Sequence, residues 1–190
     1  MKKLVHGVGV NDKHGVDERV YALWRGVLVR SNNIYEELNP TYIGVSCCKR
    51  WIKLSNFVSD ISDLHGFDNW LNQGWQLDKD ILVKGNKSYE KDMVCFVPKD
   101  VNNLFIKRGA LRGDFPIGVS YHKPLNKFRA QINIDKTKKH IGIFDDVNQA
   151  FCAYKIEKEK HIKLVAERWK GIISDNVYNA MIAYEVNIND

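Results

Sequence analysis

Basic and amide side chains concentrate in one stretch toward the C-terminal end of the chain. Residues 118–142 hold six lysines and arginines against one acid, Asp135, so they carry a net charge of +5 in a chain whose total is +6. Arginine can bind the base edge of guanine and glutamine or asparagine that of adenine, while lysine neutralises phosphate. The stretch therefore favours binding to double-stranded DNA, with an ordinary solvated surface as the alternative that charge alone leaves open.

The same stretch has the pattern of an antiparallel sheet. Polar and apolar side chains alternate along residues 127–134, as in a strand with one packed and one wet face. We predict three strands, residues 118–123, 127–135 and 138–144, joined by tight turns. A helix with an apolar stripe follows, capped by Asp145 or Asp146, and a last helix covers residues 176–184. The elements that position the basic side chains are thus three antiparallel strands backed by a helix.

Several motifs of this region, in this order, resemble the ethylene-response-factor (Apetala-two) DNA-binding domain of plants. They are Gly118-Val119-Ser120, Lys127-Phe128-Arg129-Ala130-Gln131-Ile132, His140-Ile141-Gly142-Ile143-Phe144-Asp145, and Ala150 with Ala153 and Tyr154. The sheet of that family lies in the major groove. The resemblance implies that the DNA-reading residues are Tyr121, His122, Lys127, Arg129, Gln131, Lys138 and His140. Lys139 joins them as part of the basic hairpin tip. Phe128 stands where the family usually has Trp, and the first strand has fewer arginines, so the base sequence read by the plant domains does not carry over.

A second series of motifs resembles the ββα finger of HNH homing endonucleases. It consists of Gln76-Leu77-Asp78-Lys79-Asp80-Ile81-Leu82, Gly85-Asn86-Lys87, Cys95-Phe96-Val97-Pro98 and Asn102-Asn103. The whole chain looks like phage-borne proteins that join such a finger to an ethylene-response-factor-like domain. The resemblance implies a divalent metal, magnesium, held by Asp78 and by Asn102 or Asn103, with Asn86 as the orienting residue.

The general base is the weak point of the nuclease interpretation. Lys79 stands where the family has histidine, and a lysine with an ordinary pKa of about 10.4 is a poor base at neutral pH. Asp80, two residues from Asp78 on the same strand face, is the candidate substitute. The alternatives are that Asp78 and Asp80 are ordinary surface acids on a strand, or that the finger is inactive and only contacts DNA.

The rest of the sequence bounds the class of protein. The apolar residues Val20, Trp24 and Val27 predict an early helix, and residues 4–10 and 42–47 predict short strands. Four cysteines without metal-site spacing indicate reduced thiols, and no segment has the length or pattern of a signal peptide or a membrane span. We therefore expect a cytoplasmic protein of a microbe or phage-infected cell, with no membrane partner and no small-molecule cofactor. The oligomeric state is left open.

These observations predict an α+β chain in two parts. Residues 1–106 form a mixed region that contains the finger at about 75–106, residues 107–116 are a linker, and residues 117–190 form the DNA-binding domain. The predicted function is sequence-preferring DNA binding coupled to metal-dependent cleavage, with Asp78, Asp80 and Asn86 as catalytic residues. A non-catalytic DNA-binding regulator of transcription or host defence is the alternative, and a protein-binding role has no positive signal.

Overall fold

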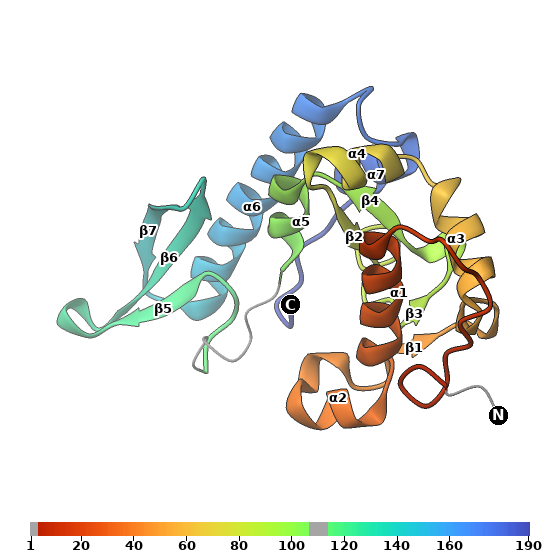
Figure 1. Cartoon of the computed structure of the whole chain (residues 1–190). Coiled ribbons are helices and arrows are strands. Elements are labelled where there is room, and N and C mark those ends of the chain that lie inside the picture. Colours follow the sequence, from red (N-terminus) through yellow and green to blue (C-terminus); the bar gives the residue numbers. More distant parts are fainter. Residues whose placement is uncertain (1–3, 107–113) are drawn as a thin grey trace. The chain divides into compact units, whose positions relative to one another are not determined.

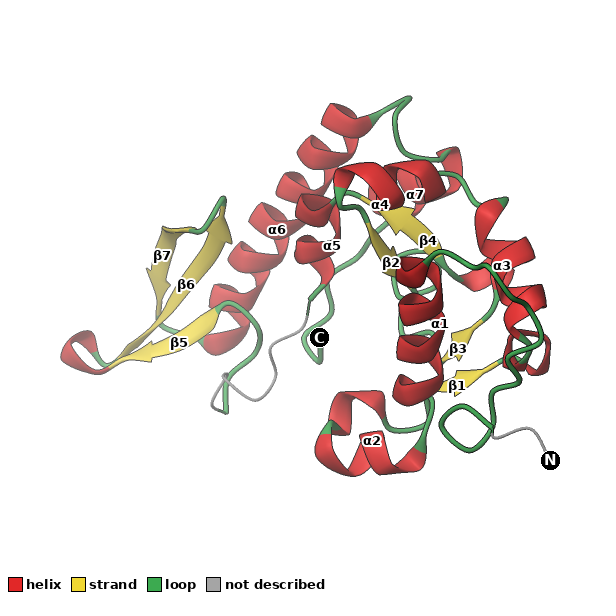
Figure 2. Ribbon diagram, viewed as in Figure 1, coloured by secondary structure: helices red, strands yellow, loops and turns green. Residues whose placement is uncertain are grey.

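A computed structural model describes residues 4–106 and 114–190 of the chain (Figure 1). The chain divides into two compact units, residues 1–102 and residues 103–190. Most of the predicted linker, residues 107–113, lies outside the described residues. The mixed α+β class is confirmed (Figure 2). No helix in the described ranges is long and apolar enough to cross a membrane.

The N-terminal unit begins with an irregular segment and one long helix. The predicted strand at residues 4–10 is wrong, because positive φ angles at His6 and Gly7 turn the chain back and leave single bridges at Val5 and Val10. Helix α1 (Glu18–Arg30) confirms the early helix, with Asp17 capping its first turn.

Short elements make up the rest of this unit. They are α2 (Asn33–Leu38), 3₁₀ turns at Pro40–Tyr42, Lys49–Ile52 and Lys91–Met93, α3 (Leu54–Ser62), α4 (Phe67–Gln73), β1 (Ser46–Cys47), β2 (Gln76–Asp78), β3 (Ser88–Tyr89) and β4 (Cys95–Val97). Strand β1 pairs in parallel with β3, and β2 pairs antiparallel with β4. Of the strand predicted at residues 42–47 only β1 forms, since Gly44 takes a positive φ.

The core of the N-terminal unit is tied together by a buried acid. Trp24 donates its indole N–H to the carbonyl oxygen of Trp51 at 2.7 Å, and Trp51 donates its own to Asp60 at 2.8 Å. Arg50 binds the two oxygens of Asp60 at 2.7 and 3.0 Å. The hydrogen bonds from Arg50 lower the pKa of Asp60, so this charge is paired inside the fold.

Helix α5 (Lys99–Phe105) follows β4 directly. Together β2, β4 and α5 give the strand, strand, helix order that was predicted for the finger. The strands hold three residues each, and their register places Gln76 opposite Val97 and Asp78 opposite Cys95.

The C-terminal unit contains the predicted sheet. Its antiparallel strands β5 (Val119–His122), β6 (Lys127–Ile134) and β7 (Thr137–Phe144) lie in the order β5-β6-β7. Helix α6 (Val147–Trp169) packs against them and α7 (Asp175–Ile182) packs on α6. Asp146 caps α6 by accepting the backbone N–H groups of Asn148 and Gln149. The prediction of three strands backed by a helix is confirmed.

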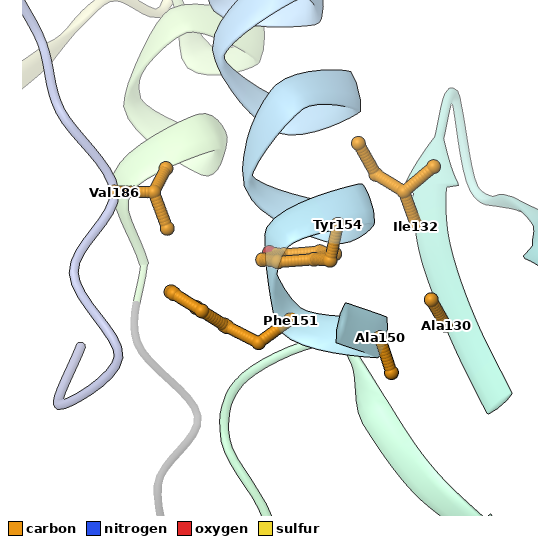
Figure 3. Packing of buried hydrophobic residues seen from close by; sticks show 6 residues of the cluster. All are labelled: Ala130, Ile132, Ala150, Phe151, Tyr154 and Val186. Carbon is orange, nitrogen blue, oxygen red and sulfur yellow. The ribbon is translucent and has the colours of Figure 1, made fainter. Parts of the chain in front are cut away.

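Small residues let the sheet approach α6 closely (Figure 3). Ala130 and Ile132 of β6 face Ala150 and Tyr154 of α6, and the cluster also holds Phe151 and Val186. Gly118 sits at φ +78°, and a Cβ atom there would lie 2.0 Å from the Tyr154 ring. Only glycine fits at this point, so the start of β5 is locked against the helix.

Candidate nucleic-acid interface

The register of the sheet decides which side chains face away from α6. Directly paired residues of antiparallel strands project to the same face. Arg129 pairs with Ser120 and Ile143, and Gln131 pairs with His140, while the intervening Ala130 is buried in the helix-facing core. We call the face opposite α6 the open face. It carries Ser120, His122, Lys127, Arg129, Gln131, Asn133, Lys138, His140 and Ile143.

Six of the eight residues predicted to read DNA meet on the open face. They are His122, Lys127, Arg129, Gln131, Lys138 and His140. The other two, Tyr121 and Lys139, are placed on the side of α6. Tyr121 pairs with Phe128 and its ring lies near those of Phe115 and Phe128, while Lys139 binds Glu157 of α6. Alternation along β5 accounts for the side of Tyr121, whereas the pairing of β7 with β6 decides the side of Lys139.

Two polar residues of the open face, in addition to the apolar Ile143, were missing from the predicted reading set. Asn133 is exposed and pairs with Lys138, two positions beyond Gln131 on the central strand. Ser120 lies at 3.4 Å from Arg129 Nε and Nη2, so it supports the guanidinium from the neighbouring strand. The alternation of polar and apolar residues along 127–134 indicates that Asn133 faces the same side as Arg129 and Gln131. Nothing in the sequence pairs Ser120 with Arg129.

The cations of the open face differ in their partners. Lys127 Nζ lies 2.9 Å from a carboxylate oxygen of Asp145, which is 79% exposed. In the described part of the chain Arg129 and Lys138 have no ion pair with an acid. His122 Nδ1 is buried and has no hydrogen-bond partner among the described residues, which is uncommon for a buried ring nitrogen. Two cations of this face, Arg129 and Lys138, thus have no acid within the described ranges that competes with a ligand.

The finger offers a contrasting arrangement around Asp78. One oxygen of Asp78 accepts the backbone N–H groups of Asp80 and Ile81 at 2.7 and 2.8 Å. Burial raises the pKa of Asp78, and these hydrogen bonds oppose the rise. Strand β2 ends at Asp78, so the expectation that Asp80 shares its strand face is wrong, because the chain turns at this point. The carboxylate closes a turn of the backbone.

Lys79 and Asn86 hold the loop between β2 and β3, which we call the finger loop (residues 79–87). Lys79 is buried, and its ammonium donates to Asp80 at 2.7 Å and to the carbonyl oxygen of Asn86 at 2.9 Å. Asn86 is also buried, and its amide donates to the carbonyl oxygens of Lys79 and Ser88 at 2.8 Å and accepts the Ser88 N–H at 2.8 Å. Asn86 therefore holds the loop through backbone groups, and its predicted orienting role in catalysis stays a prediction.

The predicted metal ligands provide few donors. Asn102 of α5 donates its amide to Gln76 at 2.5 Å, which leaves its oxygen for a ligand, and Asp78 has its second oxygen. Among the described residues no three His, Cys, Asp or Glu side chains gather as a metal site. One carboxylate oxygen and one amide oxygen are few protein ligands. They fit a magnesium ion because Mg²⁺ usually keeps several waters and takes further ligands from substrate phosphate.

We compared the chain with protein-family models, with curated proteins and with solved structures, and found no match.

Proposed function

We propose that the protein binds double-stranded DNA with the open face of the β5–β7 sheet. The observation that carries this proposal is the sorting of side chains by face. Most apolar residues of the three strands pack on α6, and the opposite face carries basic, amide and imidazole side chains together with Ser120 and Ile143. A narrow antiparallel sheet of this kind can enter the major groove, where such side chains find base edges and phosphates.

The central strand supplies the reading residues. Arg129, Gln131 and Asn133 point outward at every second position of β6, and such positions are roughly 6.8 Å apart, about two base steps of one DNA strand. Arginine suits guanine, and the two amides suit adenine. We therefore expect these three residues to prefer a DNA site with one guanine and with adenines a few base steps away. Lys127 and Lys138 at the ends of the face suit phosphates.

Gel-shift titration of the full chain with a randomised duplex library tests the proposal. Arg129→Ala is expected to weaken the selected site about 10- to 100-fold and to relax one base position. Lys170→Ala, a cation beyond the end of α6 that pairs with Glu167, serves as the control and should bind like the unchanged protein. If Arg129→Ala binds as tightly and with the same preference, the open face is not the DNA surface.

Metal-dependent cleavage by the finger is a second proposal. The specific observation in its favour is the β2, β4 and α5 arrangement, in which Asp78 ends β2 and Asn102, on the helix that follows β4, contacts Gln76 at the start of β2. Asp78 and Asn102 would hold magnesium. The bound ion would polarise the scissile phosphate and lower the pKa of a water. Asp80 remains the candidate base. One of its carboxylate oxygens accepts a hydrogen bond from Lys79, and the second oxygen would act as the base.

Asp78→Asn separates cleavage from folding better than Asp78→Ala does. The asparagine oxygen keeps the two backbone hydrogen bonds while the metal loses its anionic ligand. Nicking of plasmid DNA with magnesium, absent in chelator and lost in Asp78→Asn while gel shifts survive, would support a nuclease. Unchanged nicking removes Asp78 from the reaction. Binding without any nicking by the unchanged protein supports the rival function, a DNA-binding regulator.

The proposal includes the cytoplasm of a microbe or phage-infected cell as the place of action. DNA is accessible there, and all four cysteines, Cys47, Cys48, Cys95 and Cys152, are free thiols, as a reducing compartment keeps them.

A further inference from the structure

Strands β6 and β7 do not pair in an unbroken register. Ala130 pairs with Gly142, but the next residue, Gln131, pairs with His140, so that Ile141 is an additional residue in β7. Ile141 packs against the helix-facing core, and Gly142 lies opposite buried Ala130 on that same side. Two consecutive residues therefore face α6, which is the geometry of a β-bulge.

The bulge inverts the faces of the residues before it. In a regular strand, alternation from Phe144 through Gly142 would direct His140 and Lys138 toward α6 and Lys139 outward. With Ile141 inserted, the register places Lys138 opposite Asn133 on the open face and Lys139 opposite Ile132 on the helix side.

Contacts on both sides agree with this inversion. Lys139 Nζ lies 3.0 Å from Glu157 of α6, and this hydrogen bond lowers the pKa of the Glu157 carboxyl. Lys138 is exposed and has no ion pair in the described part of the chain. At Gly142 a Cβ atom would approach the Phe144 ring to 3.0 Å, so glycine suits the second bulge position.

We propose that the bulge at Ile141 is the device that selects the phosphate contact of β7. It assigns Lys138, with His140 beside it, to DNA, and it assigns Lys139 to the internal pairing with Glu157. This inference rests on the proposed DNA binding by the open face. It distinguishes two neighbouring lysines that composition and sequence position treat as equivalent.

The neighbouring lysines form a matched pair for the test. In gel shifts of the full chain over a range of salt concentrations, Lys138→Ala should weaken binding to every duplex about 3- to 10-fold and reduce the salt slope by about 1. Lys139→Ala and Glu157→Gln should leave both quantities unchanged, because neither side chain reaches the open face. Equal losses for Lys138→Ala and Lys139→Ala, or no loss for Lys138→Ala, overturn the inference.

Arg129→Ala separates failure of the inference from failure of the DNA-binding proposal. If Arg129→Ala weakens binding and the two lysines behave alike, only the role of the bulge is wrong. If the unchanged protein binds no duplex, or if none of the three variants alters binding, both proposals are wrong.

Discussion

The finger loop and the open face both combine lysine with polar side chains on short strands and turns, yet they use them in opposite ways. In the finger loop the ammonium of buried Lys79 donates hydrogen bonds to Asp80 and to a backbone carbonyl oxygen. The side chain of Asn86 bonds only to backbone groups. On the open face Arg129 and Lys138 have no acid partner among the described residues. Residue type alone therefore does not show whether a polar side chain is available to a ligand.

The largest effect is expected where the sheet is sealed on α6, since the open face exists only while the opposite face is packed. Gly118→Ala would force a Cβ atom into the Tyr154 ring at a positive φ, and we expect a loss of roughly 3–5 kcal/mol from the free energy of unfolding of the C-terminal unit.

Gly171→Ala is the control in the same unit. It also has a positive φ, but no atom lies within 4 Å of its added Cβ, so about 1 kcal/mol is expected from backbone strain alone. Urea denaturation followed by circular dichroism checks both. Equal small losses would mean that β5 does not depend on this close approach.

Two asparagines provide a direct test of the inward and outward arrangement. Asn86→Ala strips buried backbone groups of their partners and should lower the free energy of unfolding by about 2–3 kcal/mol. Asn133→Ala should change it by less than about 0.5 kcal/mol, because its side chain is exposed. Asn133→Ala should instead relax one base position in the duplex library. Similar stability losses for the two variants would contradict the comparison.

A smaller effect concerns the charge of Asp78. Because burial raises its pKa above the unfolded value of 3.8, its contribution to stability is fully present below pH 3.8 and is lost as pH rises through the folded pKa. Asp78→Asn, which resembles the protonated form, should remove this pH dependence without loss of stability at pH 7. Asp78→Ala should lose about 1–2 kcal/mol there, since two backbone N–H groups lose their acceptor.

The measurement is the difference in unfolding free energy between each Asp78 variant and the unchanged protein from pH 3 to pH 7. The difference is needed because it cancels the effect of Asp60, whose stability contribution depends on pH in the opposite direction. The pKa of Asp60 is lowered, so its contribution is present above the unfolded pKa and is lost as pH falls through the folded pKa. A flat difference for Asp78→Asn would show that Asp78 titrates normally.

The smallest effect is expected at the edge of the open face. Asp145 pairs with Lys127 and opposes phosphate there, so Asp145→Asn should tighten DNA binding about two- to fivefold and more strongly at low salt. Gel shifts at two salt concentrations measure it. Unchanged binding by this variant at both salt concentrations would place Asp145, and with it Lys127, outside the DNA surface.

Local pattern was enough for the C-terminal sheet and for the three helices α1, α6 and α7. The alternation along residues 127–134, the turns and the capping acid each act between near neighbours, and β5, β6, β7 and α6 form close to the predicted bounds. The predicted strands at residues 4–10 and 42–47 were mostly wrong because apolar runs there are interrupted by residues at positive φ. Short apolar runs do not distinguish such turns from strands.

The sequence by itself determined that basic, amide and apolar residues alternate in a sheet, because alternation is a property of the extended backbone. Tertiary structure decided which of them face outward. The single extra residue Ile141 reverses Lys138 and Lys139, and only pairing with β6 and packing on α6 place it in the register. Burial likewise decided that Lys79 and Asn86 bond within the finger loop, since a side chain is desolvated by residues far away in the sequence.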